Sequence, residues 1–168
     1  MNVATVDVKI IDRLKKIAIF QTIKDSDESI NALLGIISIK NFPVNSNVIV
    51  EQEMGDEMYI VLEGGVRIQK KTNAGDDYTV LFLEAEQNVF FGEMALIDDD
   101  KRSATVVTTR DSSFLVIKKK DFLEFCEKRP EICWRIILSI SRIISNRLRK
   151  TSGDMLTIFN ALVNEIDQ

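Results

Sequence analysis

The sequence predicts a mostly β domain with flanking helices, an α+β fold. Between residues 39 and 117, short apolar runs are separated by Gly, Asn and Asp turns at intervals of roughly eight to twelve residues, which is typical of a β-sandwich or barrel. On either side of this stretch, apolar residues recur at helical spacing. We therefore divide the 168 residues into an N-terminal helical bundle (1–38), a β region (39–119) and C-terminal helices (120–168), all within one domain.

Two helices are predicted before the β region. Residues 8–20 carry apolar side chains at helical spacing, and a turn containing Phe20 and Ile23 follows. Ser26 suits the N-cap of a second helix with acids in its first turn, which we extend to about Ile37. The second helix has one apolar stripe, and we assign that stripe to packing: Ile30, Leu33, Leu34 and Ile37.

The β region is predicted to contain seven or more short strands. A turn at residues 45–47, a Gly55-Asp56 turn, the Gly64-Gly65 pair and a hairpin loop at 73–76 separate the first of them. The strands are expected at residues 39–42, 48–51, 58–62, 66–71, 78–83, 103–108 and 113–117. Of these, 58–62 is apolar throughout and should be a buried strand.

The amino-acid composition excludes several classes of protein and partner. Acidic residues outnumber basic ones by 26 to 22, which gives a net charge of −4 and argues against a general nucleic-acid or anionic-membrane partner. The chain has no histidine, so a metal-binding cupin, a Ser-His-Asp hydrolase and a zinc enzyme with imidazole ligands are excluded. An N-terminal apolar signal segment is missing, and Arg135 and Arg142 interrupt the apolar run at 132–144. We expect a cytoplasmic protein that is neither secreted nor membrane-spanning.

The two cysteines, Cys126 and Cys133, lie seven positions apart in an apolar helical stretch. This spacing is not the Cys-x-x-Cys of redox motifs, and free cysteines are among the most buried residue types. We therefore predict two buried free thiols in a reducing compartment.

Residues 91–106 combine groups that suit a small anion. Gly92 allows close approach of the backbone to a ligand, and residues 93–97 can form a short helical turn with free amides. Glu93 can accept hydrogen bonds from sugar hydroxyls, and Arg102 offers a planar fork of donors that matches phosphate oxygens. Ser103 and Ala104 are small enough for their amides to reach the same phosphate. These groups fit a hydroxyl beside a singly charged phosphodiester, as in a cyclic mononucleotide.

This stretch resembles the phosphate-binding cassette of cyclic-nucleotide-binding domains, F-G-E-x-A-L followed by R-[AST]-A-[TS]-V. The resemblance implies a double-stranded β-helix, or jelly-roll-like β-roll, in which Glu93 holds the ribose 2′-hydroxyl and Arg102 holds the exocyclic phosphate oxygens. An alternative is a strand–turn–strand corner in which Glu93 and Arg102 form a solvated ion pair. The cassette residues that we expect at the ligand are Gly92, Glu93, Met94, Ala95, Arg102, Ser103 and Ala104.

A second family signature, G-D-x-x-x-Y-x-V-x-x-G-x-V, matches residues 55–66, and by resemblance Ile68 on the next strand presents an apolar wall to the purine. The cassette departs from the family pattern in three places. Asn88-Val89 replaces the usual Gly-Asp, Lys101 replaces a frequent Pro, and acids occupy residues 98–100. We expect these acids in a solvated loop, where salt screens their repulsion of an anion over about 8–10 Å. Acids that point inward would weaken phosphate binding.

The C-terminal segment predicts a helix at 120–128 and a second that begins near Pro130. In the second helix, residues recur at alternating spacings of four and three, which is typical of a coiled-coil seam and favours a parallel homodimer. The alternative is a helix that folds wholly onto its own domain. The seam consists of Ile137, Ser141, Ile144, Leu148, Thr151, Met155, Ile158 and Leu162.

Residues 147–152 resemble the Arg-Leu-x-x-Thr-Ser of the bacterial catabolite activators within this family, where the helix lies over the nucleotide. The resemblance implies that Thr151 and Ser152 contact the adenine of cyclic AMP. Alternatively, they form a helix end before Gly153, where the helix can break. The activators carry a DNA-binding domain after this helix, and because the sequence ends at Gln168 we expect no direct DNA binding.

We therefore hypothesise a stand-alone, non-enzymatic receptor without cofactor or metal, which binds cyclic AMP and signals to an unknown effector protein through movement of its C-terminal helices. Cyclic GMP is the second choice, because the Ser103 hydroxyl could meet the guanine amino group, and cyclic dinucleotides are the third. A β-roll that no longer binds nucleotide and serves as a dimerisation or partner-docking module is the alternative. An enzyme on a cupin-like roll is disfavoured by the missing histidines.

Overall fold

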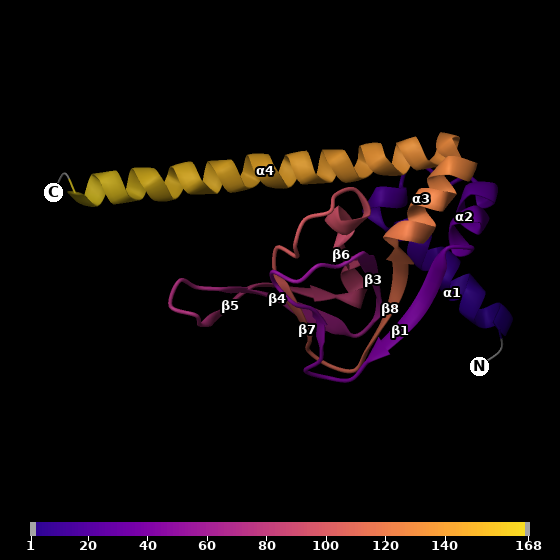
Figure 1. The fold of residues 1–168 in the computed structure, drawn as a ribbon, viewed down its shortest axis with the longest axis horizontal. Coiled ribbons are helices and arrows are strands. Elements are labelled where there is room, and N and C mark those ends of the chain that lie inside the picture. The colour runs from indigo at the N-terminus through magenta and orange to yellow at the C-terminus, as the bar shows by residue number, and fades with distance from the viewer. Residues whose placement is uncertain (1–2, 167–168) are drawn as a thin grey trace.

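The computed structural model describes residues 3–166 and consists of a β-roll with helices at one end and along one side (Figure 1). The roll is built from two four-stranded antiparallel sheets, with strand orders β1-β8-β3-β6 and β2-β7-β4-β5. The predicted α+β fold is confirmed. The strands are β1 (Ile37–Phe42), β2 (Asn47–Ile49), β3 (Glu57–Glu63), β4 (Gly65–Lys71), β5 (Asp77–Glu84), β6 (Phe90–Phe91), β7 (Thr105–Thr108) and β8 (Ser112–Lys118).

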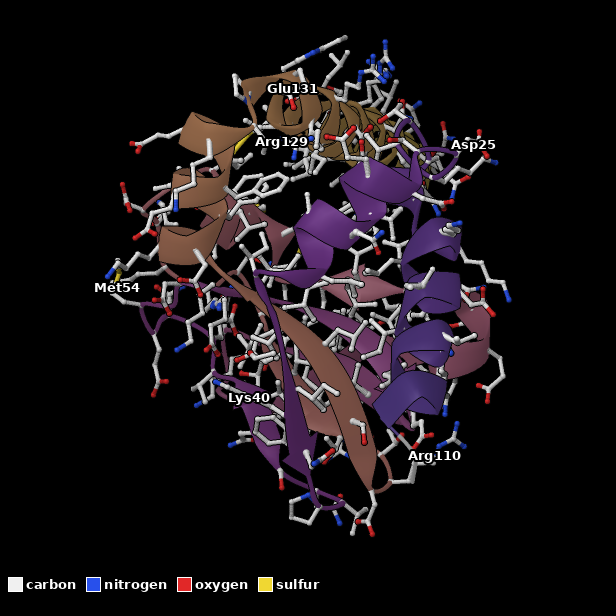
Figure 2. All side chains as sticks on the ribbon, turned by 90° about the vertical axis from the view of Figure 1, so that its right-hand side faces the viewer. Asp25, Lys40, Met54, Arg110, Arg129 and Glu131 are labelled. Carbon is white, nitrogen blue, oxygen red and sulfur yellow. A yellow bond between two sulfur atoms is a disulfide. The ribbon has the colours of Figure 1, made fainter. Side chains whose placement is uncertain are left out.

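The helices are α1 (Val3–Lys16), α2 (Asp27–Leu34), α3 (Lys119–Lys128) and α4 (Pro130–Ile166), with 3₁₀ turns η1 (Ala18–Phe20), η2 (Ala85–Gln87) and η3 (Glu93–Leu96). Ser26 is the N-cap of α2, as predicted, and its side chain accepts a hydrogen bond from the Ser29 amide. In Figure 2, α1 lies beside β1 and β8, α2 and α3 lie toward their upper ends, and α4 is seen end-on at the top.

Strand β3 explains why the molecule has two apolar cores. Met58, Ile60 and Leu62 point toward the helices and join one core, whereas Tyr59 and Val61 point into the roll and join the other. A strand with both faces buried carries apolar residues at every position, as this sequence does. Inside the roll, the rings of Tyr59 and Phe91 stack at a centroid distance of 5.3 Å, and Phe114 meets both edge-on.

The two N-terminal helices begin or end at other residues than predicted. The first begins at Val3 and ends at Lys16, and the break after it lets Ile17, Ile19 and Phe20 all enter the core. The second ends at Leu34, and Gly35 is its C-cap. Ile37 therefore does not extend the helical stripe but opens β1, where it pairs with Ile117 of β8.

Two strands of the second sheet are shorter than predicted. The chain leaves the ladder after Ile49 and enters it again only at Thr105. Between these points, residues 52–53 and 102 pair through their backbones, with 3.0 Å from the Gln52 amide to the Arg102 carbonyl and 2.9 Å from the Arg102 amide to the Glu53 carbonyl. This local pairing replaces the strand and fixes the backbone of Arg102.

The prediction of free thiols is wrong, because Cys126 and Cys133 form a disulfide with Cα atoms 5.0 Å apart. The prediction treated the two residues as one helical stretch, in which seven residues span about 10 Å. Instead, α3 ends at Lys128 and α4 begins at Pro130, so the chain reverses between the cysteines. Figure 2 labels Arg129 and Glu131 at this junction, where Arg129 also donates to Glu28 of α2. A reducing compartment, which was inferred from free thiols, is therefore no longer supported.

Helix α4 is continuous through Gly153, so the break considered from the sequence does not occur. Its first half packs on the domain through Ile132, Cys133, Ile136 and Ile140, which are buried. Residues 145–164 are exposed in the single chain, and this part extends far beyond the roll (Figure 1). Among the described residues, no helix combines the length and apolarity needed to cross a membrane.

Candidate functional site

A cavity of about 660 Å³ opens on the roll beside η3. One wall is apolar and comes from the second sheet, with Ile68, Leu81, Leu83 and Val106. The other side is polar and contains Glu93, Arg102 and Ser103, and Arg147 reaches it from α4. The cavity therefore has an apolar part and a charged part, the usual composition of a small-molecule site.

The structure brings eight of the ten predicted site residues to this cavity and leaves two outside its lining. Thr151 and Ser152 are exposed on α4 and do not line the cavity. Thr151 follows Arg147 by one helical turn, about 6 Å further along the helix axis. Those that line it are Ile68, Gly92, Glu93, Met94, Ala95, Arg102, Ser103 and Ala104.

Gly92 links strand β6 to η3 in a conformation that favours glycine. Its φ is +74°, and a Cβ there would lie 3.0 Å from both the Arg102 guanidinium and the Glu57 carbonyl. A larger residue would therefore be strained by its backbone and would also push against Arg102. Gly92 keeps the cassette turn closed on the guanidinium.

Arg102 is 9% exposed and is held by backbone carbonyls rather than by a carboxylate. It donates to Glu57 O at 2.7 Å and to Gly92 O at 3.3 Å. A Cβ on Gly55 would lie 2.3 Å from Arg102 Nε, so Gly55 makes room for this side chain. Burial lowers the pKa of the guanidinium, while nearby Tyr59 and Asp56 oppose that shift. The group remains charged, and the two backbone carbonyls use two of its five donors.

Glu93 is 3% exposed and forms an ion pair with Arg147 of α4. The Arg147 guanidinium also lies over the Phe90 ring, 5.9 Å from its centroid. The alternative of a solvated Glu93–Arg102 pair does not hold, because both side chains are buried and each has other partners. Arg147 thus attaches the long helix to the cassette.

Arg147 was not among the predicted site residues. A pattern did point to it, since Arg147 precedes Thr151 by four positions and so shares a helix face with the residue expected over the base. Its partner Glu93 is 54 positions away in the sequence, and no local pattern predicts a contact between the two residues.

The acids at residues 98–100 lie in the loop after η3, at the rim of the cavity or beside it. Asp98 and Asp100 border the cavity, and the Asp100 carboxylate accepts from the Lys101 amide at 2.7 Å. Asp99 points outward and pairs with Lys119 at 2.7 Å. Asp99 and Asp100 are exposed, as expected for a solvated loop, while Asp98 is half-buried at the rim of the cavity. Among residues 3–166, no group of three or more His, Cys, Asp or Glu side chains is arranged to hold a metal ion.

Comparison with known proteins places the fold and the cassette in one family. The family described as "Cyclic nucleotide-binding domain" matches residues 39–129. The cyclic AMP receptor protein of Thermus thermophilus is 24% identical over 128 residues, 76% of this chain and 56% of the relative. A CRP-like cAMP-activated global transcriptional regulator of Mycobacterium tuberculosis is 25% identical over 142 residues, 84% of this chain and 60% of the relative.

The chain thus spans less than two thirds of the length of these curated relatives. Among solved structures, a cyclic nucleotide-binding domain from Methylobacillus flagellatus superposes with a TM-score of 0.74 at 22% identity, covering 88% of this chain and 81% of that one. At this identity the likeness shows a shared fold.

Proposed function

The chain belongs to the cyclic nucleotide-binding domain family, and we propose that its cavity is the receptor site for a cyclic mononucleotide, with cyclic AMP as the preferred ligand. One observation carries the proposal. A buried carboxylate, Glu93, and a buried guanidinium, Arg102, border the same cavity beside an apolar wall. A ribose-phosphate ring needs an acceptor for its hydroxyl and donors for its phosphate, and the purine needs apolar surface.

Arg102 is the proposed phosphate ligand. Its two bonds to backbone carbonyls orient the guanidinium, and the remaining donors can bind two phosphate oxygens in a bidentate manner. Ser103 and Ala104 follow it directly and border the same space. Because the fork is already held before the ligand arrives, little side-chain entropy is lost on binding.

Glu93 is the proposed ribose ligand. Arg147 bonds Oε1, which leaves Oε2 for the 2′-hydroxyl. A nucleotide that enters next to this ion pair changes the surroundings of Arg147 and hence the position that α4 prefers. The ligand can shift α4 only by the difference between its affinities for the two positions.

Signalling is proposed to pass through the exposed half of α4 and a parallel homodimer. Four seam residues in this half are each more than half exposed in the single chain: Leu148, Met155, Ile158 and Leu162. The first half adds Trp134 at the same heptad spacing, also more than half exposed. A second copy of α4 would cover this stripe and would bring another Thr151 and Ser152 close to the nucleotide base.

Isothermal titration with cyclic AMP and cyclic GMP tests the proposal. We expect saturable binding of one nucleotide per chain, tighter for cyclic AMP. Absence of binding for both nucleotides at millimolar concentration would overturn the receptor assignment. Thr151→Ala should reduce the preference for cyclic AMP over cyclic GMP, and an unchanged preference would remove Thr151 from the base site.

A second function is favoured by the exposed stripe of α4. A chain that dimerises through this stripe but binds neither nucleotide would be a dimerisation or partner-docking module. Sedimentation with and without nucleotide separates the two functions, because only a receptor changes its association when the nucleotide is added.

A further inference from the structure

The turn that leads into the cassette depends on an unusual backbone conformation at Asn88. After η2, Asn88 adopts a left-handed conformation with φ 53° and ψ 52°, and β6 and Gly92 follow at once. Asparagine tolerates this conformation better than most residues, though less readily than glycine. Gln87, Asn88 and Val89 also line the cavity. The geometry of this turn therefore sets where β6, Gly92 and Glu93 lie.

One side chain from the N-terminal helix holds this turn. Arg13 of α1 donates through one terminal nitrogen to the Asn88 side-chain oxygen at 2.8 Å and to the Ala85 carbonyl. Through the other it donates to the Leu62 carbonyl at the end of β3, at 3.1 Å. A single half-buried guanidinium thus ties both ends of the turn to the strand beside it.

The hydrogen bonds from Arg13 favour the left-handed backbone conformation of Asn88 over other conformations. In the left-handed conformation its side-chain oxygen reaches the guanidinium, and the Asn88 amide donates to Ala85 O at 3.1 Å. Hydrogen bonds to a charged donor are stronger than neutral ones. Without Arg13 three acceptors lose that donor, and other conformations of the turn gain population.

We propose that Arg13 is a positioning residue for the nucleotide site: it fixes the turn at residues 85–88 so that β6 delivers Gly92 and Glu93 to the cavity. Arg13 itself does not line the cavity. Helix α1 thus contributes to nucleotide binding through Arg13. A partner that displaces α1 would therefore change the affinity for the nucleotide. The identity of the ligand rests on the proposed function, whereas the effect of Arg13 on the turn does not.

Nucleotide titration of four variants tests the proposal. Arg13→Ala should weaken cyclic AMP binding by about tenfold, the loss expected for one charge-assisted hydrogen bond. Lys9→Ala is the matched control, since Lys9 lies on the same helix and forms an exposed ion pair with Glu63; the affinity of this variant should stay within about twofold of wild type. Asn88→Gly keeps the left-handed turn without the side-chain bond. In that background, adding Arg13→Ala should cost clearly less than in the wild-type background.

Amide hydrogen exchange without nucleotide supplies a readout independent of binding. The amides of Asn88 and Val61 hydrogen-bond to Ala85 O and Val89 O across this turn. Both should exchange faster in Arg13→Ala and stay unchanged in Lys9→Ala. If Arg13→Ala fails to fold, Arg13→Lys, which keeps the charge but not the fork, is measured in the same way and should show the same direction.

Unchanged exchange in the Arg13 variant overturns the proposal, as does an equal loss of affinity in Lys9→Ala or an equal cost of Arg13→Ala in both backgrounds. If the wild-type protein binds no cyclic nucleotide, the proposed function fails, and the exchange measurement alone decides the role of Arg13.

Discussion

At the scale of single residues, the site depends on charges taken out of solvent and held by specific partners. Arg102 is held by two backbone carbonyls and Glu93 by Arg147. Removing one partner of a buried charge leaves the other charge without compensation, which costs more than the pair itself contributes. Substitutions at these positions should therefore have large effects on binding.

Arg102→Ala should weaken cyclic AMP binding by about 2–5 kcal/mol, because the phosphate would enter the cavity without its charged partner. Isothermal titration measures the change. Lys120→Ala removes an exposed cation outside the cavity and serves as the control. An Arg102→Ala protein that binds within threefold of wild type would contradict the assignment of the cassette.

Glu57 gives the protein a predictable response to acid. Burial raises the pKa of its carboxyl, but hydrogen bonds from Lys40 and Tyr59 outweigh burial and lower the pKa below its ordinary value of 4.5. The folded state thus binds this proton less readily than the unfolded state. The resulting stability is present above the ordinary pKa and is lost as the pH falls through the folded-state value. Urea unfolding should show a shallower acid decline in Glu57→Gln than in wild type, and equal declines would refute the assignment.

The sequence was sufficient to identify Glu93 and Arg102 as candidate site residues, because a spaced motif carries both. It was insufficient for Arg147 and Arg13, whose partners lie 54 and 75 positions away. Such contacts depend on how α1 and α4 lie against the roll. The spacing of Arg147 from Thr151 gives its helix face, but no local pattern in either helix specifies the partner on the roll.

At the scale of elements, strands and helices with strong periodicity were predicted well, and the errors lie where two patterns compete. Ile37 fits the helical stripe by its spacing and a strand by its β-branched side chain. In the structure it belongs to a strand, where it pairs with Ile117. Cys126 and Cys133 were assigned to one helical stretch, although Pro130 already marked a second helix. The reversal between α3 and α4 is tertiary structure that spacing alone does not reveal.

The disulfide between α3 and α4 should stabilise the domain measurably. Closing this short loop restricts the unfolded chain by about 2–3 kcal/mol in the chain-entropy model. Cys126→Ser should therefore lower the free energy of unfolding by about that amount, measured by urea unfolding without reductant. With reductant present, wild type and variant should converge. A wild-type midpoint that does not respond to reductant would contradict the prediction.

The exposed stripe of α4 should mediate association of two chains. Ile158→Asp places a charge in the middle of the stripe and should convert dimers to monomers in sedimentation experiments. Asn160→Asp adds the same charge outside the seam positions and should leave dimers intact. Monomeric wild-type protein at micromolar concentration, with and without nucleotide, would argue against this use of the stripe.

At the scale of the whole molecule, the cavity lies on the roll, and one arginine from each of two helices binds next to it. Arg13 fastens α1 to the turn before the cassette, and Arg147 fastens α4 to the cassette itself. The fold class followed from the sequence because two spaced signatures and the strand pattern agree. The resemblance of residues 147–152 placed the C-terminal helix over the nucleotide, whereas the seam pattern alone is equally satisfied by packing on another chain.

The central claim is that Glu93 and Arg102 bind the ribose and the phosphate of one cyclic nucleotide. A crystal structure determined with cyclic AMP tests this most directly. The account predicts a Glu93 carboxylate oxygen within hydrogen-bonding distance of the ribose 2′-hydroxyl and the Arg102 fork on the exocyclic phosphate oxygens. A cavity that stays empty at saturating nucleotide, or a nucleotide bound away from both side chains, would contradict it.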